Sequence, residues 1–332
     1  MGSTCNCFYK TKPSKDKELF PLQSDNKDNL KASALKILIA FRNYKKRKLF
    51  FEKKKVDFNN FLSLIQTFKS PNEVVEQVHS KLLPFNFEFL LMNDFHYLIP
   101  EKIVLDTTSA YLGYWLKNKR DGCGVQIWID GSKFEGNWKN NKTNGKGRLI
   151  HADGDVYEGN WINDKAEGYG EYTHMDGAQY KGQWYDDKQE GKGTETWPDG
   201  GIFDGNYKEG KKEGNGIFRW ADGSNYVGSF KDNMIHGKGI YCWSDGRKFE
   251  GDWYQNKMHG KGTFTWKDGR KYSGDYFEDK KHGMGIFTWP DGRFYDGPWV
   301  KGKQHGIGFY ANPKEEKKTG NWVDGHLVNN II

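Results

Sequence analysis

The first seven residues, Met-Gly-Ser-Thr-Cys-Asn-Cys, carry groups that could take acyl chains. Gly2 occupies the position that N-myristoylation requires, and Cys5 and Cys7 are thiols that could be palmitoylated, although Asn6 stands where the signal prefers Ser or Thr. One acyl chain gives only marginal membrane affinity, so neighbouring cysteines would supply the second anchor. The sequence therefore predicts a lipidated N-terminus; the alternative is an ordinary terminal segment.

A basic segment at residues 30–55 has apolar residues at helical spacing and therefore predicts a helix. Its lysines could face an anionic membrane: Lys45, Lys46, Lys48, Lys53, Lys54 and Lys55. Each such charge near an anionic leaflet contributes about 1 kcal/mol. A basic amphipathic helix also suits an acidic EF-hand partner, and the third alternative is a solvated helix that packs on its neighbours.

Part of this helix, residues 37–47, resembles a degenerate IQ motif, the helix that calmodulin-like proteins bind. Leu38 replaces the motif's Gln and Asn43 replaces its Gly. The residues expected to contact such a partner are Ile37, Leu38, Phe41, Arg42 and Arg47. The resemblance implies a calmodulin-like partner for this part of the chain.

Charge divides the chain near residues 105–110. Residues 1–110 hold 18 Lys and Arg against 12 Asp and Glu, whereas the rest holds 33 against 32. A balanced surface does not steer nucleic acid, so we expect no nucleic-acid partner. The later region also holds all 13 tryptophans and all but one of the 41 glycines.

That later region repeats every 23 residues. Counting from an aromatic residue at position 0, Gly follows at position 2, an aromatic at 4, Gly-x-Gly at 11 and 13, and usually Asp-Gly at 19 and 20. Position 15 is mostly aromatic and position 17 is usually Trp. The nine units begin at Tyr111, Phe134, Tyr157, Tyr180, Phe203, Tyr226, Phe249, Tyr272 and Tyr295.

This spacing predicts one β-hairpin per unit. Alternate residues of a strand share a face, so positions 0, 2 and 4 place rings around a glycine, while positions 1 and 3 are polar and predict a face that meets water. Glycine leaves a gap in which a ring can lie. Asp-Gly suits the positive φ of a tight hairpin turn. We therefore predict a mainly β protein, an elongated single-layer antiparallel β-hairpin solenoid with a small α-helical N-terminal region.

The pattern Tyr-x-Gly-x-Trp…Gly-x-Gly…Asp-Gly resembles the MORN (membrane occupation and recognition nexus) repeat. Together with the N-terminal features, the repeats divide the chain into four regions: a flexible N-terminus (1–29), a basic helical region (30–110), nine repeats (111–317), and a degenerate terminal repeat and tail (318–332). Ten aromatic-face residues are candidates for partner contact: Tyr157, Trp161, Tyr180, Trp184, Trp197, Trp220, Trp243, Trp253, Trp266 and Trp289.

Just before the repeats, Ser70-Pro71-Asn72-Glu73 predicts a capping box that opens a helix through about Leu82. The side of this helix expected to pack carries Val74, Val75, Val78 and Leu82. Aromatic residues then crowd the approach to unit one: Phe85, Phe87, Phe89, Phe95 and Tyr97. We predict that they cover the open sheet edge of that unit, because exposed edges promote aggregation.

Catalytic and metal chemistry is weakly represented. His236, His259, His282 and His305 share position 10, but other units hold unrelated polar residues there, which favours a loop position over a metal site. The Gly-x-Gly pairs open no helix, and no phosphate-binding loop is present. No apolar run reaches the length of a membrane-spanning helix. We therefore expect no enzyme activity, no metal and no cofactor.

The family resemblance implies a scaffold that links a membrane to cytoskeletal, ciliary or cortical partners, at the cytoplasmic face of the membrane. The expected partners are a calmodulin-like or cytoskeletal protein, the membrane surface, and a second copy of the chain through the aromatic faces. The alternative is direct phospholipid or phosphoinositide binding by the repeats, which their near-zero net charge disfavours. A remote alternative is an accessory to a lipid kinase.

Overall fold

The computed structural model describes residues 58–88, 95–105 and 108–331. The chain divides into two units, Met1–Phe58 and Asn59–Ile332, and the second is described here. The predicted acylation residues Gly2, Cys5 and Cys7 lie outside the described residues, as do the IQ-like segment, the basic helix at 30–55 and Phe89.

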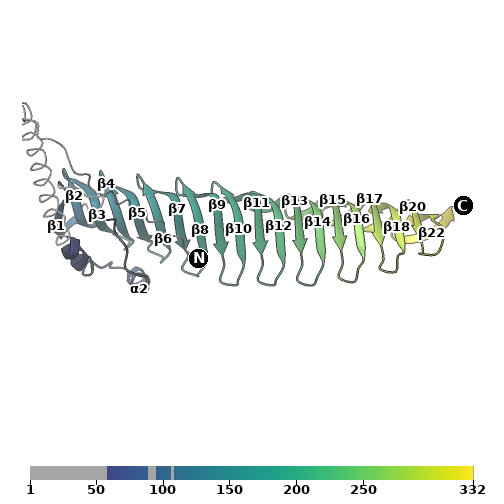
Figure 1. Ribbon diagram of the computed structural model, residues 1–332, viewed down its shortest axis with the longest axis horizontal. Helices are drawn as coiled ribbons and strands as arrows, with labels where there is room; N and C mark the ends of the chain where they lie inside the picture. The colour runs from purple at the N-terminus through teal and green to yellow at the C-terminus, as the bar shows by residue number, and fades with distance from the viewer. Residues whose placement is uncertain (1–57, 89–94, 106–107, 332) are drawn as a thin grey trace, which may run out of the picture. The chain divides into compact units, whose positions relative to one another are not determined.

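The described repeats form one antiparallel sheet of 22 strands in which strands that follow one another in the chain pair side by side (Figure 1). The sheet is a single layer of successive hairpins, as predicted. The strands are β1 (Tyr97–Val104), β2 (Ser109–Leu116), β3 (Lys119–Trp128), β4 (Lys133–Lys139), β5 (Lys142–Ile150), β6 (Val156–Ile162), β7 (Lys165–Thr173), β8 (Gln179–Tyr185), β9 (Lys188–Thr196), β10 (Ile202–Lys208), β11 (Lys211–Arg219), β12 (Asn225–Lys231), β13 (Met234–Cys242), β14 (Lys248–Tyr254), β15 (Lys257–Thr265), β16 (Lys271–Phe277), β17 (Lys280–Thr288), β18 (Phe294–Val300), β19 (Lys303–Gln304), β20 (Gly306–Ala311), β21 (Lys318–Val323) and β22 (His326–Ile331).

Two kinds of turn alternate along the sheet. Asp-Gly lies in a three-residue loop in which the Gly131 N–H donates to the Trp128 carbonyl and Gly131 has the predicted positive φ, 86°. A tighter two-residue turn at positions 6 and 7 was not predicted. Asn140 and Asn141 form one such turn with φ of 51° and 72°, the left-handed values that a two-residue hairpin requires.

The core consists of rings packed on glycines. Gly113 faces Gly124 across β2 and β3, and the Tyr111 ring covers both, so that a Cβ at either glycine would overlap with the Tyr111 hydroxyl. That hydroxyl donates to the Tyr114 carbonyl at 3.0 Å. Trp138 of the next unit packs edge-on against Tyr111 at 5.4 Å between centroids. The ring-and-glycine packing predicted from the repeat is therefore confirmed, and it also links each unit to the next.

A helix docks on the polar face of the first units. Helix α2 (Glu73–Lys81) has Asn72 as its N-cap, so the predicted capping box beginning at Ser70 is wrong. The Asn72 side chain accepts from two backbone N–H groups of the first turn and also donates to the carbonyls of Asp130 and Ala152, contacts that only the folded sheet provides. Residues 58–65 are also helical.

The packed side of α2 differs in part from the prediction. Val75 is fully buried against Ile150 and Val156, with Val78 and Leu82 beside them. Val74 is 37% exposed, because it lies off that side.

The edge of unit one is covered by a strand, β1, whose backbone pairs with β2. Of the aromatic residues predicted to cover this edge, Tyr97 lies in β1 opposite Trp115. Phe95 is 77% exposed, so most of its side chain faces solvent. Phe87 instead packs edge-on against Phe61, which in turn contacts Tyr114 of unit one.

Candidate functional site

Nine rings from positions 15 and 17 form a continuous row along units four to eight, which we call the aromatic ladder. Neighbouring ring centroids are 4.4–5.5 Å apart. Most of these rings are half-buried and the rest are buried. The ladder consists of Trp197, Phe218, Trp220, Tyr241, Trp243, Phe264, Trp266, Phe287 and Trp289.

The Asp-Gly loops hold the ladder in place. The backbone N–H of each tryptophan of the ladder donates across the loop, as Trp266 does to the Arg270 carbonyl at 2.9 Å. The loop aspartate accepts from the residue two further on, as Asp268 does from the Arg270 N–H at 3.1 Å. Arg270 also lies over the Trp266 ring, 5.5 Å from its centroid. The rings are therefore fixed before any partner arrives.

The ten predicted aromatic-face residues separate into two layers. Five lie in the ladder: Trp197, Trp220, Trp243, Trp266 and Trp289. The other five lie among the core rings beneath: Tyr157, Trp161, Tyr180, Trp184 and Trp253. Four of these five are buried and the fifth, Trp184, is partly buried, so this layer holds the fold together and only the ladder is offered to a partner.

Lys212, at position 9 of unit five, lies against the rings with a carboxylate partner. Its ammonium is 5.1 Å from the centroids of both Trp197 and Phe203. It pairs with Glu195 at 2.6 Å, and the Tyr207 hydroxyl donates to the same carboxylate at 2.9 Å. Burial and this carboxylate raise the pKa of Tyr207. The charge is thus neutralised within the chain.

Lys281, at position 9 of unit eight, lies among rings without a carboxylate. Its ammonium is 4.4 Å from the Phe287 centroid, 4.7 Å from that of Trp299, 5.1 Å from that of Trp266 and 5.4 Å from that of Tyr272. No acidic side chain of the described residues lies within ion-pair distance of it. Burial, helped by the charge of Arg270, lowers the pKa of Lys281 to about 8.

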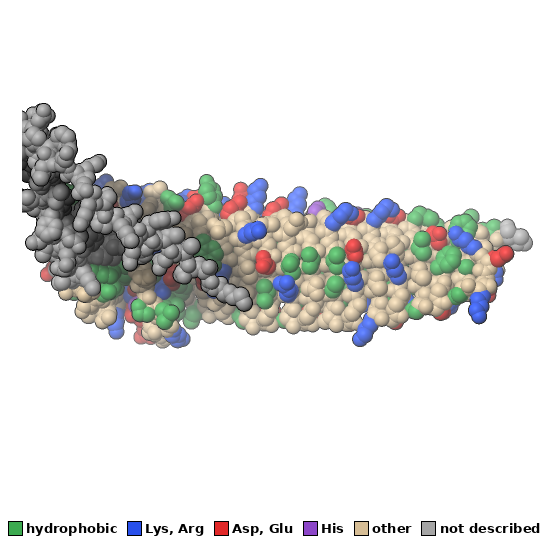
Figure 2. Space-filling view, in the orientation of Figure 1, with side chains coloured by type: hydrophobic (Ala, Val, Ile, Leu, Met, Phe, Trp, Pro, Cys, Tyr) green, Lys and Arg blue, Asp and Glu red, His purple; other side chains and the backbone are tan. Residues whose placement is uncertain are grey.

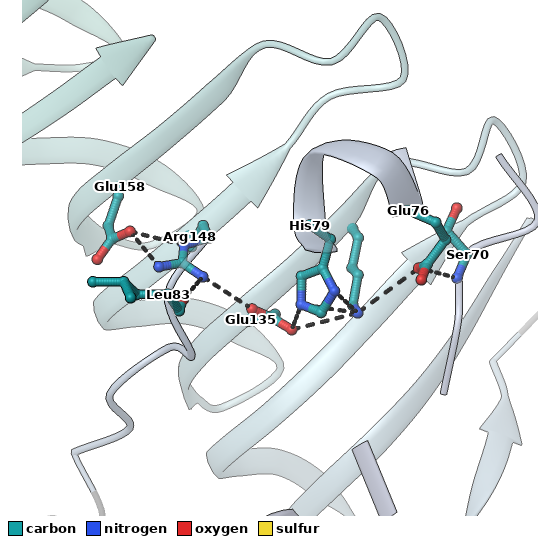
Figure 3. Close-up of polar contacts among 8 residues, drawn as sticks. Ser70, Glu76, His79, Leu83, Glu135, Arg148 and Glu158 are labelled. Carbon is teal, nitrogen blue, oxygen red and sulfur yellow. Dashed lines mark hydrogen bonds and ion pairs between the residues drawn. The ribbon is translucent and has the colours of Figure 1, made fainter. Parts of the chain in front are cut away.

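The polar face of unit two is buried under α2 and the segment that follows it, which corrects the prediction that this face meets water (Figure 3). Glu135 Oε1 lies 2.8 Å from His79 Nε2 and 3.4 Å from Lys133 Nζ, and Glu135 Oε2 lies 3.7 Å from Arg148 Nη1. Arg148 also donates to the Leu83 carbonyl at 2.9 Å. We call Glu135, Lys133, Arg148 and His79 the buried polar cluster.

The electrostatics of this cluster favour the ionised carboxylate. Burial alone would raise the pKa of Glu135, but the hydrogen bond from His79 and the charges of Lys133 and Arg148 outweigh it and lower that pKa. Each charge therefore depends on its partners, because the cluster is removed from water. The arrangement fastens α2 to the sheet.

The polar face of the later units is open. Lysines and carboxylates lie among one another on the face seen in Figure 2. Lys238 pairs with Asp252 and Lys261 with Asp275, each at 2.8–2.9 Å, and both lysines are largely exposed. Lysines at position 8 also pair with acids of the following unit, for example Lys211 with Asp232.

Three of the position-10 histidines, His236, His259 and His282, alternate with the exposed rings of Tyr254 and Phe277. His259 lies between Tyr254 and Phe277, with centroids 5.7 and 5.1 Å away. The described residues contain no group of three or more His, Cys, Asp or Glu that could hold a metal. Nor do they contain a helix long and apolar enough to cross a membrane.

Sequence reasoning missed both the lysine sites and the buried polar cluster. A signal for the cluster was present at positions 16 and 22, where Ile150 and Val156 are apolar but the later units mostly carry polar residues. For the lysines the only signal was Glu195 at a position where most other units hold an aromatic residue.

Comparison with known proteins identifies the repeat. The family model described as MORN repeat matches residues 111–133, 134–156, 157–179, 180–202, 203–225, 226–246, 249–269, 272–292 and 295–314. No curated protein matches the chain. Among solved structures, the TCP10 domain of CPAP from Danio rerio has 10% identity and a TM-score of 0.34, covering 62% of this chain and 97% of that one.

A second solved structure is the TCP domain of SAS-4 from Drosophila melanogaster in complex with a proline-rich motif of Ana2. It has 12% identity and a TM-score of 0.27, covering 52% of this chain and 82% of that one.

Proposed function

This chain belongs to the MORN-repeat family, a repeat binding module, and from that premise we propose that it is a non-enzymatic scaffold. In this proposal the aromatic ladder binds partner proteins, and the N-terminal segment holds the scaffold at the cytoplasmic face of a membrane. The cell cortex and the cilium are the proposed locations.

The aromatic ladder is the observation that carries the proposal. The core rings beneath it already pack against the glycines, so the ladder adds a second apolar layer that stays partly open to solvent. Continuous aromatic surface of this kind is typical of protein interaction sites, because aromatic rings bury much area at little cost in conformational entropy.

The membrane part rests on residues outside the described structure. Gly2, Cys5 and Cys7 would carry the acyl chains, and the basic helix would add electrostatic attraction or bind a calmodulin-like or cytoskeletal partner. To test this, the membrane fraction of the C-terminally tagged chain is compared with those of Gly2→Ala and of Cys5→Ser with Cys7→Ser. We expect both variants to become largely soluble, and an unchanged membrane fraction in both would contradict the anchor.

The calmodulin part is tested on the full chain. Calorimetric titration with calcium-loaded calmodulin should give micromolar or tighter binding, and Ile37→Glu should remove it because the motif's first apolar anchor is lost. Binding that is unaffected by Ile37→Glu would place the contact elsewhere.

Direct phospholipid binding by the repeats is the competing function. It needs a stripe of unpaired positive charge, but the repeat lysines at positions 8 and 12 include many that pair with carboxylates of the neighbouring unit: Lys165 with Asp186, Lys211 with Asp232, Lys238 with Asp252, Lys257 with Glu278 and Lys261 with Asp275. Flotation of the isolated 111–332 fragment with anionic vesicles at physiological salt decides between the two, because this fragment lacks both the acylation residues and the basic helix. Strong binding by the fragment would favour the lipid function.

A further inference from the structure

Two repeat units place a lysine at the same position on the aromatic face, and only one of these lysines is neutralised. Lys212 has Glu195, which comes from position 15 of the preceding unit. The matching residue for Lys281 is Phe264, which joins the ladder instead. At this position of the repeat, Lys212 is therefore paired with a carboxylate of the chain, whereas Lys281 is not.

The surroundings of Lys281 favour an ammonium that still lacks its counter-ion. Four rings lie within 5.4 Å of it, and such rings attract a cation through their quadrupoles. The charge of Arg270, which also acts on Lys281, is positive too and already pairs with Asp268 at 2.7 Å. A partly buried cation of this kind is costly unless an anion completes it.

We propose that the ring-lined site around Lys281 binds a peptide segment of a partner protein that presents an aspartate or glutamate side chain. The carboxylate pairs with Lys281 as Glu195 does with Lys212, and apolar residues on either side of it lie on the aromatic ladder. This inference rests on the proposed function, because it specifies the chemistry of the partner that the ladder binds.

A peptide fits the site better than a lipid headgroup does. The anion that the chain itself uses at the equivalent place is a side-chain carboxylate, held also by a Tyr hydroxyl. The site around Lys281 retains that hydroxyl as Tyr276, at position 4 opposite Lys281 across β16 and β17.

The test begins with a displayed library of random 12-residue peptides selected on the full chain. We expect the selected peptides to share an Asp or Glu flanked by apolar or aromatic residues. The tightest peptide is then titrated against wild type and Lys281→Met, because Met258 shows that position 9 accepts methionine. We expect Lys281→Met, and separately the peptide's own Glu→Gln or Asp→Asn change, to weaken binding at least tenfold.

Lys212→Met is the matched control and should leave the affinity unchanged, because that lysine is already paired. Glu195→Gln should free Lys212 and raise the number of peptides bound from one to two. Selection of no peptide, selection without an acidic residue, or equal affinity of Lys281→Met would each overturn the inference.

Failure of this inference can be distinguished from failure of the proposed function. Non-acidic peptides that bind the ladder independently of Lys281 would leave the scaffold function standing, whereas the anchor experiments test that function without any peptide. Loss of binding to vesicles of phosphatidylcholine with 30% phosphatidylserine on Lys281→Met, with no peptide effect, would assign the site to lipid and overturn the inference.

Discussion

Glu135 and Glu250 occupy the same position of their repeat units, yet they lie in opposite environments. The Glu135 side chain is 4% exposed and is surrounded by His79, Lys133 and Arg148. The Glu250 side chain is 59% exposed and pairs with Lys248. The sheet is the same in both places, and the difference arises because α2 and the segment after it cover the polar face of the first units only. Whether another segment docks on a repeat unit therefore decides whether its polar residues are buried in ion pairs or exposed to solvent.

The largest expected effect comes from removing Glu135. Glu135→Ala takes from the buried Lys133 its nearer carboxylate, so that only Glu76 at 4.0 Å remains, and it leaves Arg148 with Glu158 alone. Removing one member of a buried charge cluster should lower the free energy of unfolding of the docked region by about 3 kcal/mol. Hydrogen exchange of the α2 amides measures this, since undocking should expose them. Glu250→Ala is the control and should change stability by less than about 0.5 kcal/mol. Equal effects of the two variants would show that burial does not separate the two positions.

A smaller effect is expected from the apolar contact that fixes the same helix. Val75 is fully buried against Ile150 and Val156, so Val75→Ala should cost about 2 kcal/mol. Thermal unfolding together with α2 exchange rates would measure it. Val74→Ala changes a neighbouring residue that lies off the packed side, and a comparable loss there would mean that α2 is docked differently.

The hairpin sheet was predictable because its determinants are local and recur. The ring of Tyr111 and the glycines it covers lie within one hairpin, so a 23-residue pattern is enough to predict their packing. The turn at Asn140 and Asn141 was not predicted, although two consecutive Asn or Asp residues are a recognised signal for left-handed turns. The residues at these two positions vary more from unit to unit than the recurring Asp-Gly does.

The docking of α2 was not predictable in the same way. Glu135 fits the polar repeat pattern as well as Glu250 does, and nothing in either residue says whether another segment will cover it. The N-cap was misplaced for a related reason: Ser70 and Asn72 are both good caps, and the choice follows from the hydrogen bonds of Asn72 to loops 58 and 80 residues away. Long-range contacts of this kind leave little trace in the sequence.

Lys281 and Lys212 extend the comparison to the aromatic face. Replacing either lysine should change the free energy of unfolding by about 1 kcal/mol, but with opposite signs. Lys281→Met should stabilise the protein at pH 7, because it removes a partly buried cation that lacks a counter-ion. Lys212→Met should destabilise it, because Glu195 is left unpaired. Urea unfolding followed by tryptophan fluorescence would measure both, and a shift of the same sign in the two variants would contradict the different environments.

The stability difference between wild type and Lys281→Met should also depend on pH in a predictable direction. The pKa of Lys281 is lowered to about 8 in the folded chain, whereas an unfolded lysine titrates near 10.4. Between these values the unfolded state binds more protons, so wild-type stability attributable to Lys281 should rise with pH. The advantage of Lys281→Met should therefore shrink from pH 8 to about pH 10, and a constant difference over that window would mean that Lys281 does not titrate as described.

The smallest effect is expected where an ion pair lies on the open polar face. Lys238 and Asp252 are 2.8 Å apart, about as close as Arg148 and Glu158 at 2.7 Å, so distance alone would rank the two pairs equally. Lys238 is largely exposed, however, and its ammonium regains water when the pair is broken, whereas Arg148 is buried and does not. Lys238→Ala should therefore change the free energy of unfolding by less than about 0.5 kcal/mol, a change that added salt reduces further. Urea unfolding at low and high salt measures this, and a loss as large as that of Glu135→Ala would mean that the covering helix is not what separates the two regions.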